Sequence, residues 1–531
     1  MKRKTILFGI DGATWNFIDK FMEENVMPTM SYILKHGARG TLLSTFPPET
    51  MAAWTSIFTG VNPGKHGVPD FRLRVNNRIE LAGSHYRMVD TIWKIMSQNG
   101  LRSIVVNDPV TYPPDPINGI VTTGLMTPPN LNYAYPPELR SEIDSVVGGY
   151  LCEPPPDFFE KAMKAKPDAY QMLEEVATKH AKTALHLARN HEWDILAPIF
   201  TTTDRLQHVF FSDREYIKRH YALIDGFLRQ FLEIAVNENA NLFIVSDHGF
   251  GQSNRALYIN TWLTQLGFEK VKKSSIRSLL ASSGLTLYKL TELVGKLHLS
   301  RAAFKLYRIF PKIITVLPFE SYEEGEIDYT ASQAYSSAYH GIYLNTALHG
   351  QEYEKVRNAI IHQLDALTDD GIKVIEKLYK REEVLWGEYS NRAPDIFVVM
   401  SEGYGMSTHL NPKVFDRLRN REVIISGSHR AEGIFAAFGP DIRSNMHLHE
   451  PVNTWDVAPT ILHMHNLPIP EHMDGKALVA MLRDDSELNK SSRLELISER
   501  HRIKERIRTI ESSQGKTSVP QDRANQTKIK G

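Results

Sequence analysis

Three aspartates, Asp11, Asp204 and Asp247, stand where apolar runs typical of buried strands come to an end. A carboxylate in that position lies at the carboxyl edge of a sheet, where α/β proteins bind their ligands. One such aspartate is ordinarily a helix N-cap or a turn residue. Three of them, followed by turn or helix-start residues, favour a shared site.

Two histidines accompany these carboxylates. Asp204 and His208 are four residues apart, so both side chains point from one face if a helix begins there. His248 directly follows Asp247, and a turn can aim two neighbours at one ion. Carboxylate and imidazole ligands without sulfur suit zinc, manganese or iron better than magnesium or calcium. The spacing therefore favours a metal site, with ordinary structural roles as the alternative.

Thr50 precedes a predicted short helix over residues 52–59. Its ordinary role there would be that of the N-cap. The same position would suit a nucleophile, because helix-terminal N–H groups stabilise an arriving phosphoryl group. A nearby divalent cation would also lower the pKa of its hydroxyl. The residues alone leave both roles open.

The elements that must position these residues alternate between short β-rich runs and helical patterns. The predicted strands are residues 6–9, 40–43, 103–106, 193–200 and 241–246, and the predicted helices are residues 16–36 and 52–59. Runs that are apolar on consecutive positions indicate strands buried on both faces. The sequence therefore predicts an α/β fold with a large doubly wound, mostly parallel sheet and helices on both of its faces.

Composition restricts the class of protein. The 531 residues contain 62 Lys and Arg against 62 Asp and Glu, so no global charge favours a nucleic acid or a membrane surface. Any anion site must be built locally. A single cysteine, Cys152, excludes an intrachain disulfide and cysteine-rich metal motifs. The apolar run near Met1 is too short for a signal peptide, and no stretch is apolar enough to span a membrane. We expect a cytoplasmic protein.

Two segments differ from the rest of the chain. Residues 270–326 are basic and Leu-rich, which predicts an inserted helical cap. The basic face of this cap is exposed to solvent in one interpretation. In the other, the cap is a lid that contacts an anionic substrate or a membrane surface. Residues 486–531 predict a charged amphipathic helix, which offers a surface for a homodimer, and then a disordered tail. The catalytic domain is then expected to comprise residues 1–269 and 327–485.

With these motifs in place, the sequence resembles the type I phosphodiesterase/nucleotide pyrophosphatase family of the alkaline phosphatase superfamily, and most closely its microbial phosphohydrolase branch. The matching signatures are Gly9-Ile-Asp11-Gly12, Met27-Pro-Thr-Met with Gly37, Pro48-Glu-Thr50, Thr59-Gly-Val-Asn-Pro-Gly-Lys-His66-Gly67, Asp204 with His208, Ser246-Asp-His-Gly249, Gly427-Ser-His429-Arg430 with Gly433-Ile-Phe, Asp456-Val-Ala-Pro-Thr-Ile-Leu and Met473-Asp-Gly475. They run in family order from residue 6 to about residue 476.

The resemblance implies an alkaline phosphatase-like fold and two divalent metal ions, with zinc expected first and manganese or iron as alternatives. One ion would be held by Asp11, Asp247, His248 and the Thr50 oxygen, and the other by Asp204, His208 and His429. Thr50 would attack phosphorus and form a phospho-threonine. The second metal would stabilise the leaving oxygen and then deliver the water or hydroxide that hydrolyses this intermediate. His429 is nominated by the family pattern alone.

Two departures from the family bear on the substrate. Thr50 is followed by Met51-Ala-Ala53 instead of a Pro-Asn pair, and Phe71 stands where the family carries an asparagine that holds a phosphate oxygen. We therefore expect Lys65, Arg430 or backbone N–H groups to hold the phosphate. Nucleotide specificity stays open.

Three functions are compatible with these residues. The first is a dimetal phosphohydrolase acting on a small phosphodiester, pyrophosphate or related phosphate ester. The second is a phosphoryl or phospho-alcohol transferase or mutase of the same superfamily, and the third is a non-catalytic metal-bound scaffold. His66 and His340 are expected to support a turn or the ligands without binding metal themselves.

Overall fold

The computed structural model describes residues 3–490, apart from residues 76–77, 129–130, 156, 273–326, 339, 418 and 421–422. Nearly all of the predicted cap, residues 270–326, and the tail beyond residue 490 therefore lie outside the described residues. Among the described residues, no helix is both long and apolar enough to cross a membrane.

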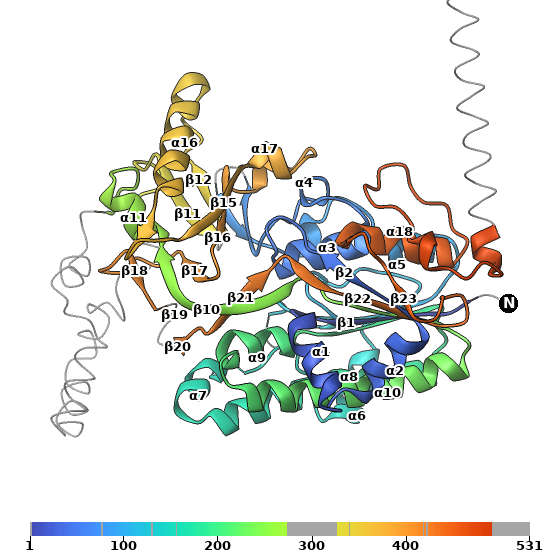
Figure 1. The fold of residues 1–531 in the computed structure, drawn as a ribbon. Helices are drawn as coiled ribbons and strands as arrows, with labels where there is room; N and C mark the ends of the chain where they lie inside the picture. The colour runs from blue at the N-terminus through green and yellow to red at the C-terminus, as the bar shows by residue number, and fades with distance from the viewer. Residues whose placement is uncertain are drawn as a thin grey trace, which may run out of the picture.

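A large sheet forms the centre of the molecule (Figure 1). Its strand order is β23-β2-β22-β9-β1-β8-β5-β6-β7, and β24 also pairs with β2. The strands are β1 (Thr5–Ile10), β2 (Ala38–Leu43), β5 (Ser103–Asp108), β6 (Gly119–Thr123), β7 (Ala134–Tyr135), β8 (Ile195–Phe200), β9 (Asn241–Val245), β22 (Glu432–Phe438), β23 (Met446–His447) and β24 (Val452–Asn453). The five strands from β9 to β6 run parallel, whereas β22 and β7 run antiparallel to their neighbours.

Both faces of the sheet are covered, as the consecutive apolar runs predict. Phe8 in β1 joins the core on one face, and its neighbour Leu7 joins the core on the other. Helices α1, α2, α6, α8, α9 and α10 lie on the first face, and α3, α5 and α18 on the second (Figure 1). The doubly wound, mostly parallel α/β fold is thus confirmed.

The helices of this part of the molecule have the following bounds: α1 (Trp15–Glu23), α2 (Pro28–His36), α3 (Thr50–Thr59), α4 (Pro63–His66), α5 (Ile92–Gln98), α6 (Leu139–Val147), α7 (Phe158–Lys164), α8 (Lys166–Asn190), α9 (Thr202–Phe210), α10 (Arg214–Asn237) and α18 (Val457–Met464). The small hairpin β3 (Arg72–Val75) and β4 (Arg78–Leu81) follows α4.

The prediction of one helix over residues 16–36 is wrong. The segment forms two helices, α1 and α2, with a turn between them. Asn25 adopts a positive φ of 55° in that turn, which no helix can continue through. Pro28 then occupies the first position of α2, where its missing N–H group costs no helical hydrogen bond.

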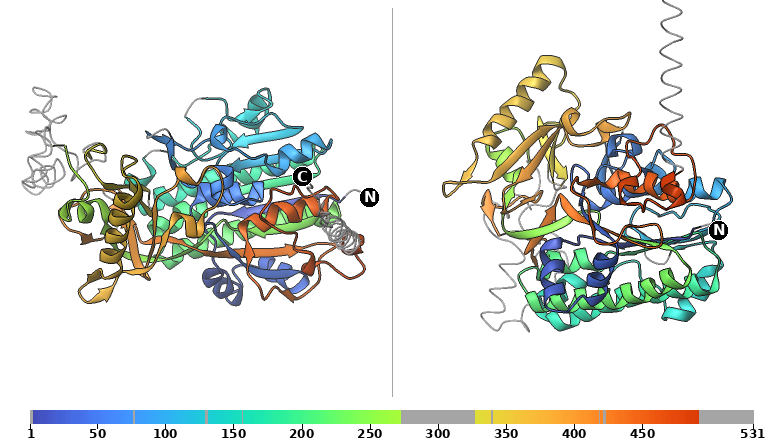
Figure 2. Two further views of the ribbon diagram at one scale, coloured as in Figure 1. Left: turned by 90° about the horizontal axis from the view of Figure 1, so that it is seen from above. Right: turned by 45° about the vertical axis from the view of Figure 1, so that its right-hand side comes forward.

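A smaller β-rich part is inserted between β9 and β22 and lies beside the edge at which β1 ends (Figures 1 and 2). One of its sheets contains β10 (Gly249–Tyr258), β17 (Gly403–Ser407), β18 (Phe415–Asp416) and β21 (Gly427–Arg430). The other contains β11 (Ala334–Ala338), β12 (Gly341–Leu344), β15 (Ile375–Lys380) and β16 (Ile396–Met400). The helices are α11 (Ile259–Gln265), α16 (Gly350–Asp365) and α17 (Arg381–Val384), and the remaining short strands are β13 (Thr368–Asp369), β14 (Ile372–Lys373), β19 (Arg419–Asn420) and β20 (Val423–Ile424).

Candidate metal centre

Three neighbouring parallel strands deliver the predicted carboxylates to one place. Asp11 follows β1, Asp247 follows β9, and Asp204 lies in the first turn of α9, directly after β8. Strands β9, β1 and β8 are adjacent in the sheet, so their carboxyl ends meet. All three side chains are buried.

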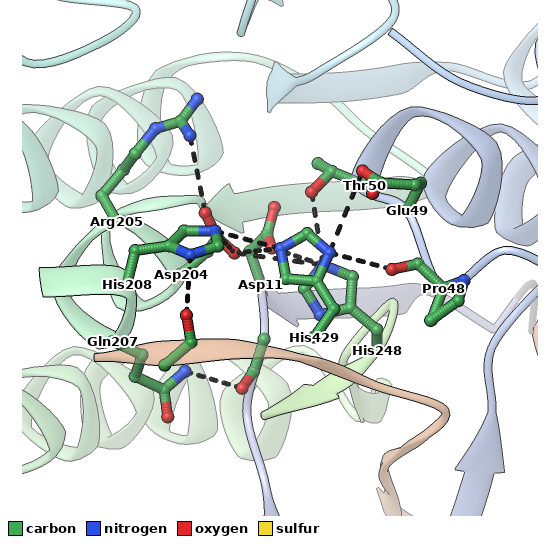
Figure 3. Close-up of polar contacts among 12 residues, drawn as sticks. Asp11, Pro48, Glu49, Thr50, Asp204, Arg205, Gln207, His208, His248 and His429 are labelled. Carbon is green, nitrogen blue, oxygen red and sulfur yellow. Dashed lines mark hydrogen bonds and ion pairs between the residues drawn. The ribbon is translucent and has the colours of Figure 1, made fainter. Parts of the chain in front are cut away.

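Three histidines reach the same place, as Figure 3 shows. His208 lies one turn after Asp204 on α9, and its Nε2 is 3.4 Å from Asp204 Oδ1. His429 comes from β21, opposite Phe250 of β10, and its Nε2 is 3.1 Å from both Asp204 Oδ1 and His208 Nε2. His248 Nε2 lies 3.2 Å from Asp247 Oδ2 and 3.6 Å from Asp11 Oδ1.

These contacts define two overlapping groups that share Asp204. The first group consists of Asp11, Asp204 and His248, and the second consists of Asp204, His208 and His429. In each group the ligand atoms all lie within 4.8 Å of one another. The structure thus brings together the six carboxylate and imidazole residues that the sequence analysis nominated as ligands.

The backbone fixes which nitrogen of each imidazole faces the site. Nδ1 of His208 lies 3.2 Å from the carbonyl oxygen of Gly427, and Nδ1 of His429 lies 2.9 Å from that of Pro48. Nδ1 of His248 lies 3.1 Å from the carbonyl of Gly249. A carbonyl can only accept, so each Nδ1 carries the proton and each Nε2 presents a lone pair. This is the arrangement in which histidine binds metals.

The result is a set of acceptors that face one another. Nε2 of His208, Nε2 of His429 and Oδ1 of Asp204 converge, and with both Nε2 atoms unprotonated a shared cation would satisfy all three. Buried Asp11 Oδ1 and Asp247 Oδ2 have no hydrogen-bond partner among the described residues. The residues present therefore fit divalent metal ions of the kind that accept nitrogen and oxygen ligands.

The pKa shifts of the three carboxyl groups are consistent with a divalent cation at this site. Burial raises the pKa of Asp11 well above its usual range, and the charges of Asp247 and Asp204 raise it further. Burial likewise raises the pKa of Asp247. Burial opposes ionisation of Asp204 too, but when the rings of His208 and His429 are protonated they outweigh it and hold the pKa of that carboxyl well below its usual range. Without a cation, the site thus contains carboxylates that burial forces toward protonation.

Thr50 is the first residue of α3, and Glu49 is the N-cap. The N-cap interpretation of Thr50 is therefore wrong, and the Thr50 hydroxyl is not used to cap the helix. Its Oγ1 instead lies 3.3 Å from Nε2 of His248. The side chain is buried, and the unpaired N–H groups of the first helical turn begin at the same point. The hydroxyl is thus placed between the positive end of a helix and the ligand set.

Two further buried residues, Trp54 and Glu49, contribute to the positioning of this set. Neither has a role assigned from the sequence. Trp54, one turn along α3 from Thr50, donates from Nε1 to Asp11 Oδ2 at 3.1 Å. Its ring packs so closely on β1 that a Cβ on Gly9 would lie 2.5 Å from it. Glu49 Oε1 lies 3.0 Å from Nε2 of His340, which comes from the β-rich insertion. A carboxylate directly before Thr50 was the available signal for Glu49, whereas nothing in the local pattern marks Trp54.

His66 and His340 have different surroundings. His66 accepts from the backbone N–H of Val68 at Nδ1 and pairs with Ser56 Oγ through Nε2, so it holds the turn after α4. Burial lowers its pKa to about 3 and keeps it neutral. His340 is paired with Glu49, and its ring stacks toward His429 with the centroids 6.3 Å apart.

The two residues expected to hold phosphate are engaged elsewhere. Lys65 Nζ lies 2.6 Å from Asp474 Oδ1 and 3.0 Å from the carbonyl oxygen of His472. Arg430 donates to the carbonyl oxygens of His429 and Gln252, along the β10–β21 pair. The guanidinium that does contact the ligand set is that of Arg205, which lies 3.6 Å from Asp204 Oδ2 (Figure 3).

The profile of the type I phosphodiesterase/nucleotide pyrophosphatase family matches residues 5–431. No relative was found among curated protein sequences.

Solved structures with a similar fold include human ectonucleotide pyrophosphatase/phosphodiesterase 5, with a TM-score of 0.52 and 16% identity over 91% of this chain and 100% of that one. The murine protein, as an inactive threonine-to-alanine variant in complex with AMP, gives a TM-score of 0.53 and 14% identity over 91% and 100%. Phosphonoacetate hydrolase from Sinorhizobium meliloti 1021, in complex with phosphonoformate, gives 0.54 and 15% over 88% and 95%.

Proposed function

The chain belongs to the type I phosphodiesterase/nucleotide pyrophosphatase family, and from this premise we propose that it is a dimetal phosphohydrolase with Thr50 as its nucleophile. Its substrate is a small phosphodiester, a pyrophosphate or a related phosphate ester. Zinc is the first candidate for both ions, with manganese or iron as alternatives. The catalytic domain comprises residues 1–269 and 327–485.

The observation that carries this proposal is the convergence of lone pairs beside a helix-terminal hydroxyl. Asp11, Asp247, His248 and the Thr50 oxygen would hold one ion, and Asp204, His208 and His429 the other. When bound, two such ions supply positive charge for the attacking and leaving oxygens and lower the pKa of a hydroxyl and of a water molecule. A scaffold without chemistry would need the ligands but would not need Thr50 among them.

The chain's own residues account for the other parts of the reaction. The Thr50 oxygen forms a bond to phosphorus as the bond to the leaving oxygen breaks, which yields a phospho-threonine. The N–H groups at the start of α3 point toward the same place and favour the negative phosphoryl group. Water then breaks the bond between phosphorus and the threonine oxygen. Trp54 holds Asp11 in place during both steps through its indole N–H.

The structural neighbours support a nucleotide-type ester as one substrate to test. The murine ectonucleotide pyrophosphatase/phosphodiesterase 5 structure holds AMP in a variant made inactive by a threonine-to-alanine change. Phosphonoacetate hydrolase, which shares the fold, shows that this architecture also accommodates a phosphonate. A panel of substrates is therefore required.

The test combines metal analysis with a panel of phosphate monoesters, diesters, dinucleotide pyrophosphates, phosphonates and sulfate esters. We expect about two equivalents of metal and turnover of at least one phosphorus ester. The variant Thr50→Ala should lose this turnover and retain most of its metal, because six of the seven ligands remain. Near-normal rates in Thr50→Ala would contradict the nucleophile, and a metal-loaded protein inactive on the whole panel would contradict the enzyme. Transfer of the phosphoryl group to added alcohols in preference to water would instead identify a transferase.

A further inference from the structure

The ligand set is rich in acids, and among the described residues only one arginine or lysine side chain forms an ion pair with it. Four buried carboxylates, those of Asp11, Glu49, Asp204 and Asp247, lie at or beside it. Arg205, the residue after Asp204, is that cation: its Nη1 lies 3.6 Å from Asp204 Oδ2. Lys65 and Arg430 are committed to other partners, as described above.

Arg205 is held in one orientation by a second carboxylate. Nε of its guanidinium lies 2.9 Å from Glu153 Oε2, in the segment that follows α6. Among the described residues, Glu153 is its one hydrogen-bond partner, so most of its five N–H donors have no acceptor. The side chain is partly exposed, at 20%, and so can reach a ligand from solvent. A fixed guanidinium with free donors is the typical recognition group for a phosphate.

The guanidinium lies on the same side of the ligand set as the proposed nucleophile (Figure 3). In Figure 3 it approaches Asp204 from the side of the ligand set on which the Thr50 hydroxyl also lies. It is therefore close to a carboxylate that belongs to both metal groups.

We propose that Arg205 binds a non-bridging oxygen of the substrate phosphoryl group and takes the place of the asparagine that Phe71 replaces. This inference rests on the proposed function and extends it to the recognition of the substrate. Glu153 is then a positioning residue, which orients the guanidinium without contacting the substrate. Nothing in the sequence marks Arg205, because its neighbours Asp204 and His208 account for the motif without it.

The test uses the zinc-loaded full-length protein and the variants Arg205→Ala, Arg205→Lys and Arg219→Ala. Arg219, on α10, is a matched control, because its guanidinium also pairs with a carboxylate, Glu174 at 2.8 Å, but is exposed. Ester turnover, metal content and the binding of inorganic phosphate by calorimetry are measured for each protein.

We expect Arg205→Ala to lower kcat/KM by about 100-fold and to weaken phosphate binding, with metal content unchanged. Arg205→Lys should recover part of the loss, since it keeps the charge but not the planar pair of donors, and Arg219→Ala should match the wild type. Wild-type phosphate affinity in Arg205→Ala, or a loss that follows the loss of metal, would overturn the inference. If the wild type turns over no ester, the proposed function fails, whereas the phosphate calorimetry still decides the role of Arg205.

Discussion

The indole Nε1 of Trp54 donates to Asp11 Oδ2 at 3.1 Å, and this hydrogen bond joins the helix that carries Thr50 to the end of strand β1. Oδ1 of the same carboxylate has no partner among the described residues and faces His248 at 3.6 Å. One oxygen of Asp11 is thus fixed by the protein, and the other is left for an ion. Ligand orientation of this kind, set by a hydrogen bond to the ligand's other atom, tunes metal sites generally.

Replacing Trp54 with Phe should lower kcat/KM by about 10-fold, because Asp11 loses the group that orients it. Stability should fall by about 1–2 kcal/mol from the lost ring volume and hydrogen bond. The matched control is Trp93→Phe on α5, since Trp93 is also buried but its indole N–H has no partner among the described residues. The measurements are kcat/KM and the thermal unfolding of both variants. Equal activity in the two variants would show that the Trp54–Asp11 bond does not orient the ligand.

His429→Ala should reduce bound metal from about two equivalents to about one, because the variant removes one of three ligands around one proposed ion. Metal analysis after dialysis measures this directly. His449→Ala, which removes an exposed histidine, should keep both equivalents. Chelation of the wild type should also lower its melting temperature by about 5 °C or more, since buried acceptors then face one another without a cation. Unchanged stoichiometry in His429→Ala would remove His429 from the ligand set.

Stability should fall as the pH rises through the window in which Glu269 loses its proton. Burial raises the pKa of this carboxyl from 4.5 to about 8, although a hydrogen bond from Thr264 lowers it. Between these values the folded protein keeps a proton that the unfolded chain releases, so the free energy of unfolding decreases with pH. Below pH 4.5 both states hold the proton, and the effect disappears.

Glu269→Gln removes this dependence while keeping the shape of the side chain. Relative to the wild type, it should gain about 4 kcal/mol on going from pH 5 to pH 9. Denaturant unfolding at the two pH values measures the difference, and Glu233→Gln, at an exposed position of α10, is the control. A stability difference that is the same at pH 5 and pH 9 would show that Glu269 does not titrate in this window.

The sequence predicted the parts of the site that depend on strand ends. Asp11, Asp204 and Asp247 follow apolar runs, and the carboxyl ends of neighbouring parallel strands have to meet. His208 and His248 come with them, because each is adjacent in sequence or one helical turn away. Thr50 could be placed at the start of its helix, although its N-cap role and its nucleophile role could not be separated from pattern alone.

The sequence could not predict contacts between distant segments. His429 reaches Asp204 through the pairing of β21 with β10, and antiparallel pairing across so many residues leaves no local pattern. Trp54 appears as an ordinary apolar residue of a buried helix, and its indole N–H becomes significant only beside Asp11. The two-helix structure of residues 15–36 was missed because the amphipathic pattern continues across the turn at Asn25.

The β-rich insertion leaves the central sheet after β9 and returns to it at β22, and these two strands are immediate neighbours, with Val245 paired to Phe435. A segment whose two ends meet can be lengthened, trimmed or exchanged during evolution while the strand register on either side stays fixed. Asp247 and His248 stand at its departure and His429 at its return. Diversification of the insertion can therefore change the residues that surround the candidate metal centre while the proposed ligands at its two ends are kept.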